Sequence, residues 1–307
     1  MRGTLRPMSD GRLSMQQVLA RFDQAIGLET SPRTSAGTGA VPEAPSAADR
    51  VPVPAVVAPA RAPAASAAAT PALRTAAAPA AAPIASTHVY PPESLRAPGD
   101  AADRARRLSE IDARHAASCP HCLAATGHTR LVFGEGAAHA ELMFVGEAPG
   151  DAEDRAGRPF LGAAGEKLDE MIKAMGLSRE QVYIASILKS RTPDNRTPMP
   201  EEVAACGPFL MEQILAVQPK VIVTLGGPAA KWICGTDAGI SRIRGTWQQW
   251  TPPAGADCPS IAVMPTYHPS YVLRTYTKQV RMEVWSDLRA VLAKLGRTPP
   301  VPGGTNG

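Results

Sequence analysis

Between residues 101 and 297, short apolar runs alternate with longer amphipathic segments, and this alternation restricts the possible folds more than any other feature. Runs such as LMFVG and KVIVTLGG are typical of buried strands, whereas the segments between them carry apolar residues at helical spacing. The predicted strands span residues 131–134, 140–147, 181–190, 220–227 and 261–268, and the predicted helices span 101–118, 167–177, 200–219, 228–235 and 279–296. Strands that alternate with helices predict an α/β domain with a mostly parallel central sheet.

Three chemically unusual segments each follow a predicted strand, at residues 146–150, 186–191 and 268–274. In open parallel sheets, ligands bind beyond the carboxyl ends of the strands. We therefore expect these three segments to meet at one edge of the sheet and to form the functional site.

The segment GEAPGDAEDRAGRPFLGAAGEKL, residues 146–168, argues against two common ligands. It lacks the G-x-G-x-x-G spacing of a dinucleotide loop, and GAAGEK lacks the hydroxyl that follows lysine in a P-loop. Its carboxylates would also repel a phosphate. Carboxylates beside the ring of Phe160 suit a flat, uncharged ring and a water molecule to be activated. Alternatively, Phe160 is a core residue and the acids are solvated residues at a helix start.

The first hundred residues differ in composition from the rest. Residues 34–100 are mostly Ala and Pro with almost no aromatic side chains, so we expect a disordered tether. The preceding residues 1–33 contain SMQQVLARFDQAIGLE (14–29), which predicts an amphipathic helix that is either marginal alone or docks a partner. The folded domain is expected over residues 101–297, followed by a disordered tail over 298–307.

The start of the chain lacks a basic-then-apolar signal-peptide layout, and no apolar run suits a membrane span, so we expect a cytoplasmic protein without membrane contact. The formal net charge is +4. This weak positive charge means that nucleic-acid binding would depend on local patches.

The sequence contains five cysteines, an odd number that argues against a disulfide framework. Cys119 and Cys122 form a C-x-x-C pair with ligand-type spacing. Three histidines, His115, His121 and His128, lie near this pair, so a Cys/His zinc site is conceivable. We interpret Cys234 and Cys258 as core or loop residues.

Three linked motifs, GEAPGDAEDRAGRPFLGAAGEKL, LKSRTPDNRTPMPEE and HPSYVLR, together resemble the family 4 uracil-DNA glycosylases. These are bacterial and archaeal base-excision enzymes that usually carry an iron–sulfur cluster. The resemblance covers residues 119–294, with the motifs in the family's order. It implies a three-layer α/β/α sandwich with a central, mostly parallel sheet.

The resemblance also implies roles for individual residues. Glu147 would position or activate water, Phe160 would stack on uracil, and His268 would hydrogen-bond the uracil O2, where negative charge grows as the bond breaks. The backbone around Gly146, Ala148 and Gly150 would approach the base. The residues expected to contact DNA are Lys189, Arg191, Asn195, Arg196, Ser270 and Arg274. For the first four of these, an ordinary solvated loop is a competing interpretation.

This sequence departs from the family pattern at two positions. Ser186 stands where the family has an asparagine that reads the polar edge of uracil, and a hydroxyl cannot reproduce the two-ended hydrogen bonding of an amide. Ser190 stands where the family has a cluster cysteine, so that Cys119, Cys122 and Cys206 are the expected ligands that remain. The alternatives are a 4Fe-4S cluster with serine or another group as fourth ligand, a labile cluster, or none. We favour the 4Fe-4S cluster.

The sequence therefore predicts a monomeric DNA glycosylase that removes uracil from single- or double-stranded DNA, leaves an abasic site and needs no nucleotide cofactor. The retention of Glu147, Phe160 and His268 favours an enzyme. One alternative is a glycosylase of the same fold with a different base preference because of Ser186. The other is a non-enzymatic module that binds DNA or a partner, with the N-terminal helix recruiting a repair or replication protein.

Overall fold

The computed structural model of the 307-residue chain describes residues 88–300. The expected helix over residues 14–29, the tether up to residue 87 and the last seven residues of the tail lie outside this part. Within residues 88–300, no helix combines the length and the apolar character needed to cross a lipid bilayer.

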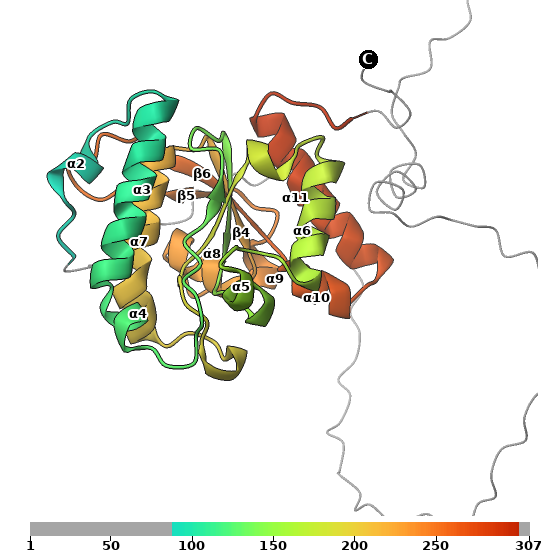
Figure 1. Ribbon diagram of the computed structural model, residues 1–307. Helices are drawn as coiled ribbons and strands as arrows, with labels where there is room; N and C mark the ends of the chain where they lie inside the picture. Colours follow the sequence, from blue (N-terminus) through green and yellow to red (C-terminus); the bar gives the residue numbers. More distant parts are fainter. Residues whose placement is uncertain (1–87, 301–307) are drawn as a thin grey trace, which may run out of the picture. The chain divides into compact units, whose positions relative to one another are not determined.

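A six-stranded sheet forms the centre, with the strand order β1-β3-β2-β4-β6-β5 (Figure 1). Its strands are β1 (Glu135–Gly136), β2 (Leu142–Gly146), β3 (Tyr183–Ser186), β4 (Val221–Leu225), β5 (Gln248–Trp250) and β6 (Ile261–Thr266). The four central strands run parallel, and the two edge strands, β1 and β5, are antiparallel to their neighbours. The mostly parallel sheet predicted from the sequence is thus confirmed.

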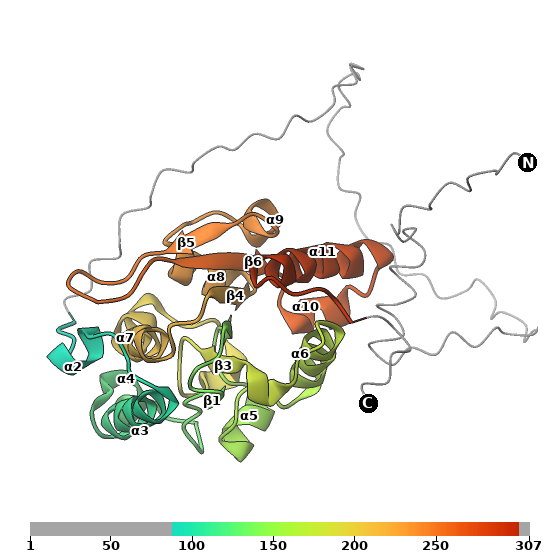
Figure 2. The same ribbon diagram turned by 90° about the horizontal axis from the view of Figure 1, so that it is seen from above.

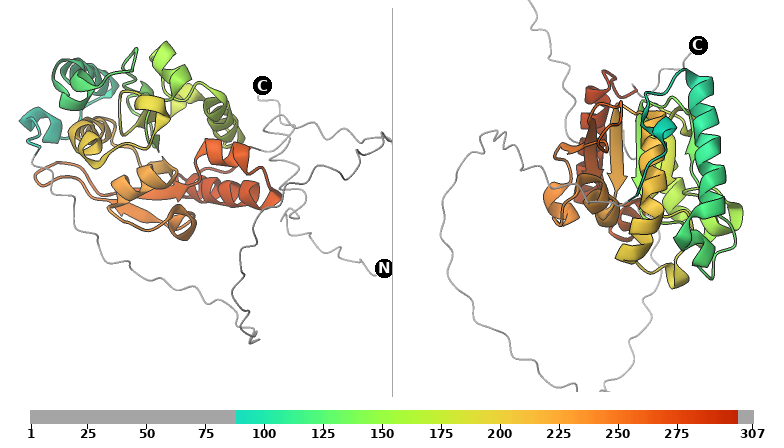
Figure 3. Two further views of the ribbon diagram at one scale, coloured as in Figure 1. Left: turned by 90° about the horizontal axis from the view of Figure 1, so that it is seen from below. Right: turned by 90° about the vertical axis from the view of Figure 1, so that its left-hand side faces the viewer.

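Helices cover both faces of the sheet, as the views from above and below show (Figures 2 and 3). One face carries α3 (Ala101–Ser118), α4 (Pro120–Ala124), α7 (Pro200–Val217) and α8 (Gly227–Cys234), and the other carries α6 (Ala163–Ala174), α10 (Pro269–Arg274) and α11 (Lys278–Lys294). Successive strand residues alternate between the faces. In β2, Met143 and Val145 pack towards α3 and α7, whereas Leu142 and Phe144 pack towards α6 and α11. The result is the expected three-layer α/β/α sandwich.

One strand prediction differs from the structure. Residues 131–134 form no strand, although Val132 N–H donates to the Lys189 carbonyl at 2.7 Å; the short strand β1 follows instead. Residues 240–250 form the helical turn α9 (Ile240–Ile243) and then β5. Gly245, at φ +70°, separates the two, and Arg244 turns inward to the buried carboxylate of Asp287.

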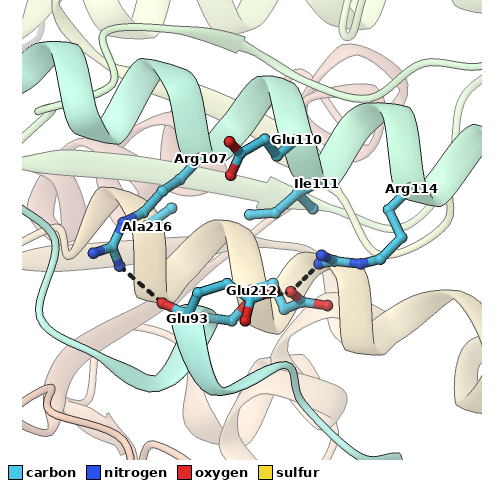
Figure 4. A pocket seen from close by; sticks show the side chains of 8 residues that line it. Glu93, Arg107, Glu110, Ile111, Arg114, Glu212 and Ala216 are labelled. Carbon is cyan, nitrogen blue, oxygen red and sulfur yellow. Dashed lines mark hydrogen bonds and ion pairs between the residues drawn. The ribbon is translucent and has the colours of Figure 1, made fainter.

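Ordered structure begins upstream of Ala101, within the last part of the predicted tether. Helix α2 (Pro92–Leu95) packs on α7 and α3 around a pocket shown in Figure 4. The carboxylate of Glu212, 1% exposed, accepts hydrogen bonds from Ser94 Oγ and from the Arg114 guanidinium. Because a buried carboxylate requires partners, the residues before Ala101 are part of the packed domain.

The short helix α5 (Asp151–Ala156) and the 3-10 turns Arg179–Gln181 and Pro193–Asn195 complete the described elements. The segments that follow β2, β3 and β6 lie at the carboxyl edge of the sheet, as predicted. Helix α7 runs back from this edge, so α2, which contacts its second half, lies towards the amino edge.

We predict that Glu212→Ala lowers the free energy of unfolding by about 3 kcal/mol, because Arg114 and Ser94 lose their shared buried acceptor. Urea denaturation followed by circular dichroism measures the change. The matched control is Glu110→Gln, which removes an exposed pair with Arg106 and is expected to cost under about 1 kcal/mol. Equal effects of the two substitutions would contradict the assigned role of Glu212.

Candidate active site and metal centre

The loop between β2 and α6 is held by one carboxylate. Glu153 accepts hydrogen bonds from the backbone N–H groups of Gly150 at 3.1 Å, Leu161 at 2.8 Å and Gly162 at 3.3 Å. Neighbouring Asp154, 2% exposed, accepts from Thr129 N–H at 2.7 Å and Arg130 N–H at 3.2 Å. Several acids of this loop therefore bind backbone amides and fix the loop, a role that the sequence analysis did not foresee.

Phe160 is fixed between two glycines. A Cβ atom at Gly146 would lie 2.6 Å from Phe160 Cζ, and one at Gly165 would lie 2.0 Å from the Phe160 carbonyl oxygen. Phe160 itself is 7% exposed and adopts φ +53°, a left-handed conformation that is unfavourable for an aromatic residue. Gly146 is therefore required by the Phe160 ring, a close contact that the sequence analysis assigned to an approaching base.

His268 lies beside Phe160, with the ring centroids 5.8 Å apart and the planes inclined by 33°. It caps the N-terminus of α10, where its Nδ1 accepts from Ser270 N–H at 3.1 Å and lies 2.8 Å from Ser270 Oγ. A backbone N–H can only donate, so Nδ1 is the unprotonated nitrogen and Nε2 carries the proton of the neutral ring. Burial, with Arg274 as a smaller contribution, lowers the pKa of His268 to about 4. At neutral pH the ring is thus an uncharged donor through Nε2.

Glu147 directly follows β2, and Ser186 is the last residue of the adjacent strand β3. Glu147 is partly buried, and this burial raises the pKa of its carboxyl group. Its carbonyl oxygen accepts from Leu188 N–H at 3.1 Å, which ties it to the segment after β3. Ser186 is 3% exposed, and its Oγ would lie 3.2 Å from a Cβ atom at Gly146. A carboxylate, a hydroxyl, an aromatic ring and an imidazole therefore gather at the carboxyl edge of the sheet.

The residues expected to contact DNA differ in accessibility. Lys189 is fully buried, and its Nζ donates to the Ser186 carbonyl at 2.7 Å and to Gln213 Oε1. Burial also lowers its pKa to about 8. Because its ammonium group cannot reach a phosphate, the prediction for Lys189 is wrong.

The other basic residues of this segment already have partners. Arg191 donates to Asp151 Oδ1 at 3.1 Å and to Asn195 Oδ1 at 2.9 Å, whereas Arg196 pairs with both carboxylate oxygens of Glu202 at 2.7 and 2.8 Å. Arg274, at the end of α10, is exposed. Among the predicted contact residues, Arg274 is therefore more accessible to a phosphate than Arg191.

A second group of functional side chains lies between α3, α4 and α7. The ligand atoms of His115, Cys119, Cys122 and Cys206 all lie within 4.8 Å of one another, and all four residues are buried. His115 Nε2 is 3.2 Å from Cys122 Sγ and 3.6 Å from Cys206 Sγ, and the two sulfur atoms are 3.8 Å apart. These residues form a group that can hold a metal.

Ser190, at the expected position of the missing cysteine, lies beside this group. Its Oγ is 3.5 Å from Cys122 Sγ and 3.1 Å from His121 Nε2. The fourth donor is His115, which precedes Cys119 by one helical turn at the end of α3. In the sequence, His115 is only one of three histidines near the C-x-x-C pair, and its spacing of four and seven residues from Cys119 and Cys122 was the available signal.

The distances between these donor atoms also indicate whether a four-iron cluster fits between them. Such a cluster binds each protein ligand to a different iron at the corners of a cube, so its ligand sulfurs lie across the cluster from one another. Here Cys122 Sγ and Cys206 Sγ are in contact at 3.8 Å, and the imidazole lies against both. The four donors as placed leave no room for a four-iron cube between them.

Comparisons with known proteins agree with these features. The model of the uracil DNA glycosylase superfamily matches residues 133–289. A Type-4 uracil-DNA glycosylase of Thermotoga maritima is 41% identical over 182 residues, which is 59% of this chain and 91% of that protein. A Type-4 uracil-DNA glycosylase of Archaeoglobus fulgidus is 41% identical over 194 residues, 61% of this chain and 93% of that protein. A Type-5 uracil-DNA glycosylase of Pyrobaculum aerophilum is 30% identical over 174 residues, 52% of this chain and 74% of that protein.

We predict that Gly146→Ala destabilises the protein by about 1–3 kcal/mol, because the new methyl group displaces the Phe160 ring from a filled core. The matched control is Gly239→Ala, where a Cβ atom meets nothing within 4 Å and only a helix cap is weakened, at a cost below about 1 kcal/mol. Urea denaturation compares the two variants. A Gly146→Ala protein as stable as the wild type would show that Phe160 is not held by this contact.

The lowered pKa of His268 also predicts a stability difference that depends on pH. The unfolded chain takes up a proton at this residue as pH falls through 6.5, whereas the folded protein does so only near pH 4. Protons therefore favour the unfolded chain in this window, and the contribution of His268 to stability falls as pH decreases from about 6.5 to about 4. We expect wild type to lose more stability than His268→Gln over this range in urea denaturation. The exposed His139→Gln variant should follow the wild type.

Proposed function

Because the chain belongs to the uracil DNA glycosylase superfamily, we propose that it hydrolyses the N-glycosidic bond of uracil in DNA and leaves an abasic site for base-excision repair. The observation that carries this proposal is the gathering of Glu147, Phe160, Ser186 and His268 at the carboxyl edge of the sheet. This edge is where an α/β sheet of this kind binds its ligand.

Glu147 is proposed to position and activate the water that attacks the sugar C1′. Partial burial raises the pKa of its carboxyl group and thus makes the carboxylate a stronger proton acceptor. A carboxyl group accepts a proton only in its ionised form. The general-base role requires this ionised form.

His268 is proposed to stabilise the departing base. Bond cleavage leaves negative charge on uracil, and a neutral imidazole that donates from Nε2 to O2 counters this charge as it develops. The Ser270 N–H fixes the required tautomer, and the low pKa keeps the ring neutral. A second proton on the ring is unnecessary because the donor is already in place.

Phe160 and Ser186 are proposed to recognise the base. The aromatic face suits stacking on a flipped-out pyrimidine, and Ser186 Oγ offers one hydrogen bond on the neighbouring strand. The backbone at Ala148 and Gly150 would border the base. Because a hydroxyl replaces the expected amide, a shifted base preference is the second candidate function.

Arg191, Asn195, Arg196, Ser270 and Arg274 are proposed to face the DNA backbone. The ion pairs of Arg191 with Asp151 and of Arg196 with Glu202 would have to open or share their donors for a phosphate contact. We therefore expect Arg274 to contribute more to DNA affinity than either of these arginines.

We propose that the protein acts as a monomer in the cytoplasm, without a nucleotide cofactor, and that the segment 14–29 recruits a repair or replication protein. This rests on the sequence pattern alone. The sequence also led us to expect a 4Fe-4S cluster on Cys119, Cys122 and Cys206, which would require these donors to move apart. Water activation by Glu147 and stabilisation of the departing base by His268 do not involve a metal.

The test of the function is single-turnover base release from single- and double-stranded oligonucleotides that contain uracil, hypoxanthine, xanthine or thymine opposite guanine. Uracil release is the expected outcome. Release of another base in preference to uracil would favour the second candidate, and DNA binding without any release would refute the enzyme. The variant Ser186→Asn restores the expected amide, and we expect it to increase the selectivity for uracil.

We predict that Glu147→Gln and His268→Ala each slow uracil release by about 100-fold or more and change the dissociation constant for DNA only a few-fold. Each removes a group that acts mainly in the transition state. The control is Glu166→Gln, which alters an exposed carboxylate at the start of α6 and should retain wild-type rates. Parallel losses of binding and rate would point to damaged folding instead of lost chemistry.

A further inference from the structure

The metal-binding group between α3, α4 and α7 has the dimensions of a site for a single ion. A tetrahedral zinc ion with bonds of about 2.3 Å to sulfur and 2.0 Å to nitrogen holds two thiolates about 3.8 Å apart and an imidazole nitrogen about 3.5 Å from a thiolate. The Cys122–Cys206 sulfur distance is 3.8 Å, and His115 Nε2 lies 3.2 and 3.6 Å from these two sulfurs. These three donors therefore have the spacing of one face of such a tetrahedron, and Cys119 Sγ lies within 4.8 Å of each of them.

The chemistry of the donors favours the same ion. Three thiolates and one imidazole are a set that structural zinc sites use, whereas iron–sulfur clusters of this type are held by four thiolates. Ser190 does not supply the fourth thiolate, and its oxygen is engaged with His121 Nε2. The His115 ring faces the sulfurs through Nε2, whereas its Nδ1 has no hydrogen-bond partner within residues 88–300. Nε2 is thus the nitrogen available to an ion.

We infer that Cys119, Cys122, Cys206 and His115 bind one zinc ion in this protein, in place of a four-iron cluster, with His115 as the ligand that compensates for Ser190. The ion joins the α3–α4 junction to α7. It also supports the segment after β3, because Lys189 N–H donates to Cys206 Sγ at 3.3 Å. All four ligands are closed off from solvent, which is typical of a structural zinc site without an open position.

The first measurement is the metal content of the full-length protein. The chain is purified without oxygen from cells supplied with both iron and zinc, and is then incubated with ferrous iron and sulfide. We expect about one zinc ion per chain, retained against a chromophoric chelator, and no broad visible absorption from an iron–sulfur cluster. About four irons and four sulfides per chain would overturn the inference, as would zinc that the chelator removes at once.

The second measurement identifies the fourth ligand. We expect His115→Ala to weaken zinc affinity by at least about 100-fold and to lower the melting temperature, whereas Ser190→Ala, which removes only a contact of Cys122 and His121, should change both much less. Equal losses in the two variants, or a loss only in Ser190→Ala, would overturn the assignment of His115. Neither readout depends on base release, so failure of this inference is distinguishable from failure of the proposed function.

A third variant covers the case in which His115→Ala does not fold. His115→Cys offers a fourth thiolate from the same turn of α3 and is expected to restore folding and metal binding. Cobalt substituted for zinc reports the ligands through its visible spectrum, which should shift between wild type and His115→Cys because nitrogen is exchanged for sulfur. An unchanged cobalt spectrum would show that His115 is not a ligand.

Discussion

The contact of the Phe160 ring with the Cα atom of Gly146 determines how the rest of the active-site edge is arranged. It joins the last residue of β2 to the loop before α6, in which Phe160 adopts a left-handed backbone conformation. Such a conformation persists only where the surroundings enforce it. Here the enforcing groups are Gly165, which admits the Phe160 carbonyl, and Glu153, which binds the amides on both sides of the loop. The aromatic face, Ser186 and His268 consequently have fixed relative positions before any substrate arrives.

The sequence was sufficient to predict the parallel sheet and the meeting of three segments at its carboxyl edge. Strand and helix periodicity is read from neighbouring residues, and the carboxyl ends of parallel strands always lie at one edge. The sequence was insufficient where a side chain depends on a distant neighbour. Lys189 looks like a surface lysine in LKSRTP, and only the hydrogen bonds to Gln213 and to the Ser186 carbonyl show that it is buried. The importance of His115 likewise depends on α7 bringing Cys206 to the end of α3. The resemblance to a family supplied the site residues but could not foresee how this chain accommodates two serines.

The segment from Ser186 to Ser190 connects the two functional regions. One end borders Phe160 and the other lies against Cys122 and Cys206, and Lys189 between them is hydrogen-bonded to Ser186 and to Cys206. Gln213 completes this link, since it accepts from Lys189 and donates to Tyr183 Oη and the Phe133 carbonyl. A substitution at Ser186, beside Phe160, therefore acts on the same segment as one at Ser190, beside Cys122. The two departures from the family pattern are structurally adjacent even though they concern different chemistry.

The described region ends at the amino edge of the sheet, away from Phe160 and His268, and its first helix packs on α7. Helix α2 contacts the second half of α7, and Pro300 lies against Gly176 just beyond the end of α6. A protein anchored to a solid support at residue 300 would thus present its carboxyl edge to the solution. Such an immobilised preparation would offer long DNA an unobstructed approach, which makes this architecture suitable for removing uracil from samples on a surface.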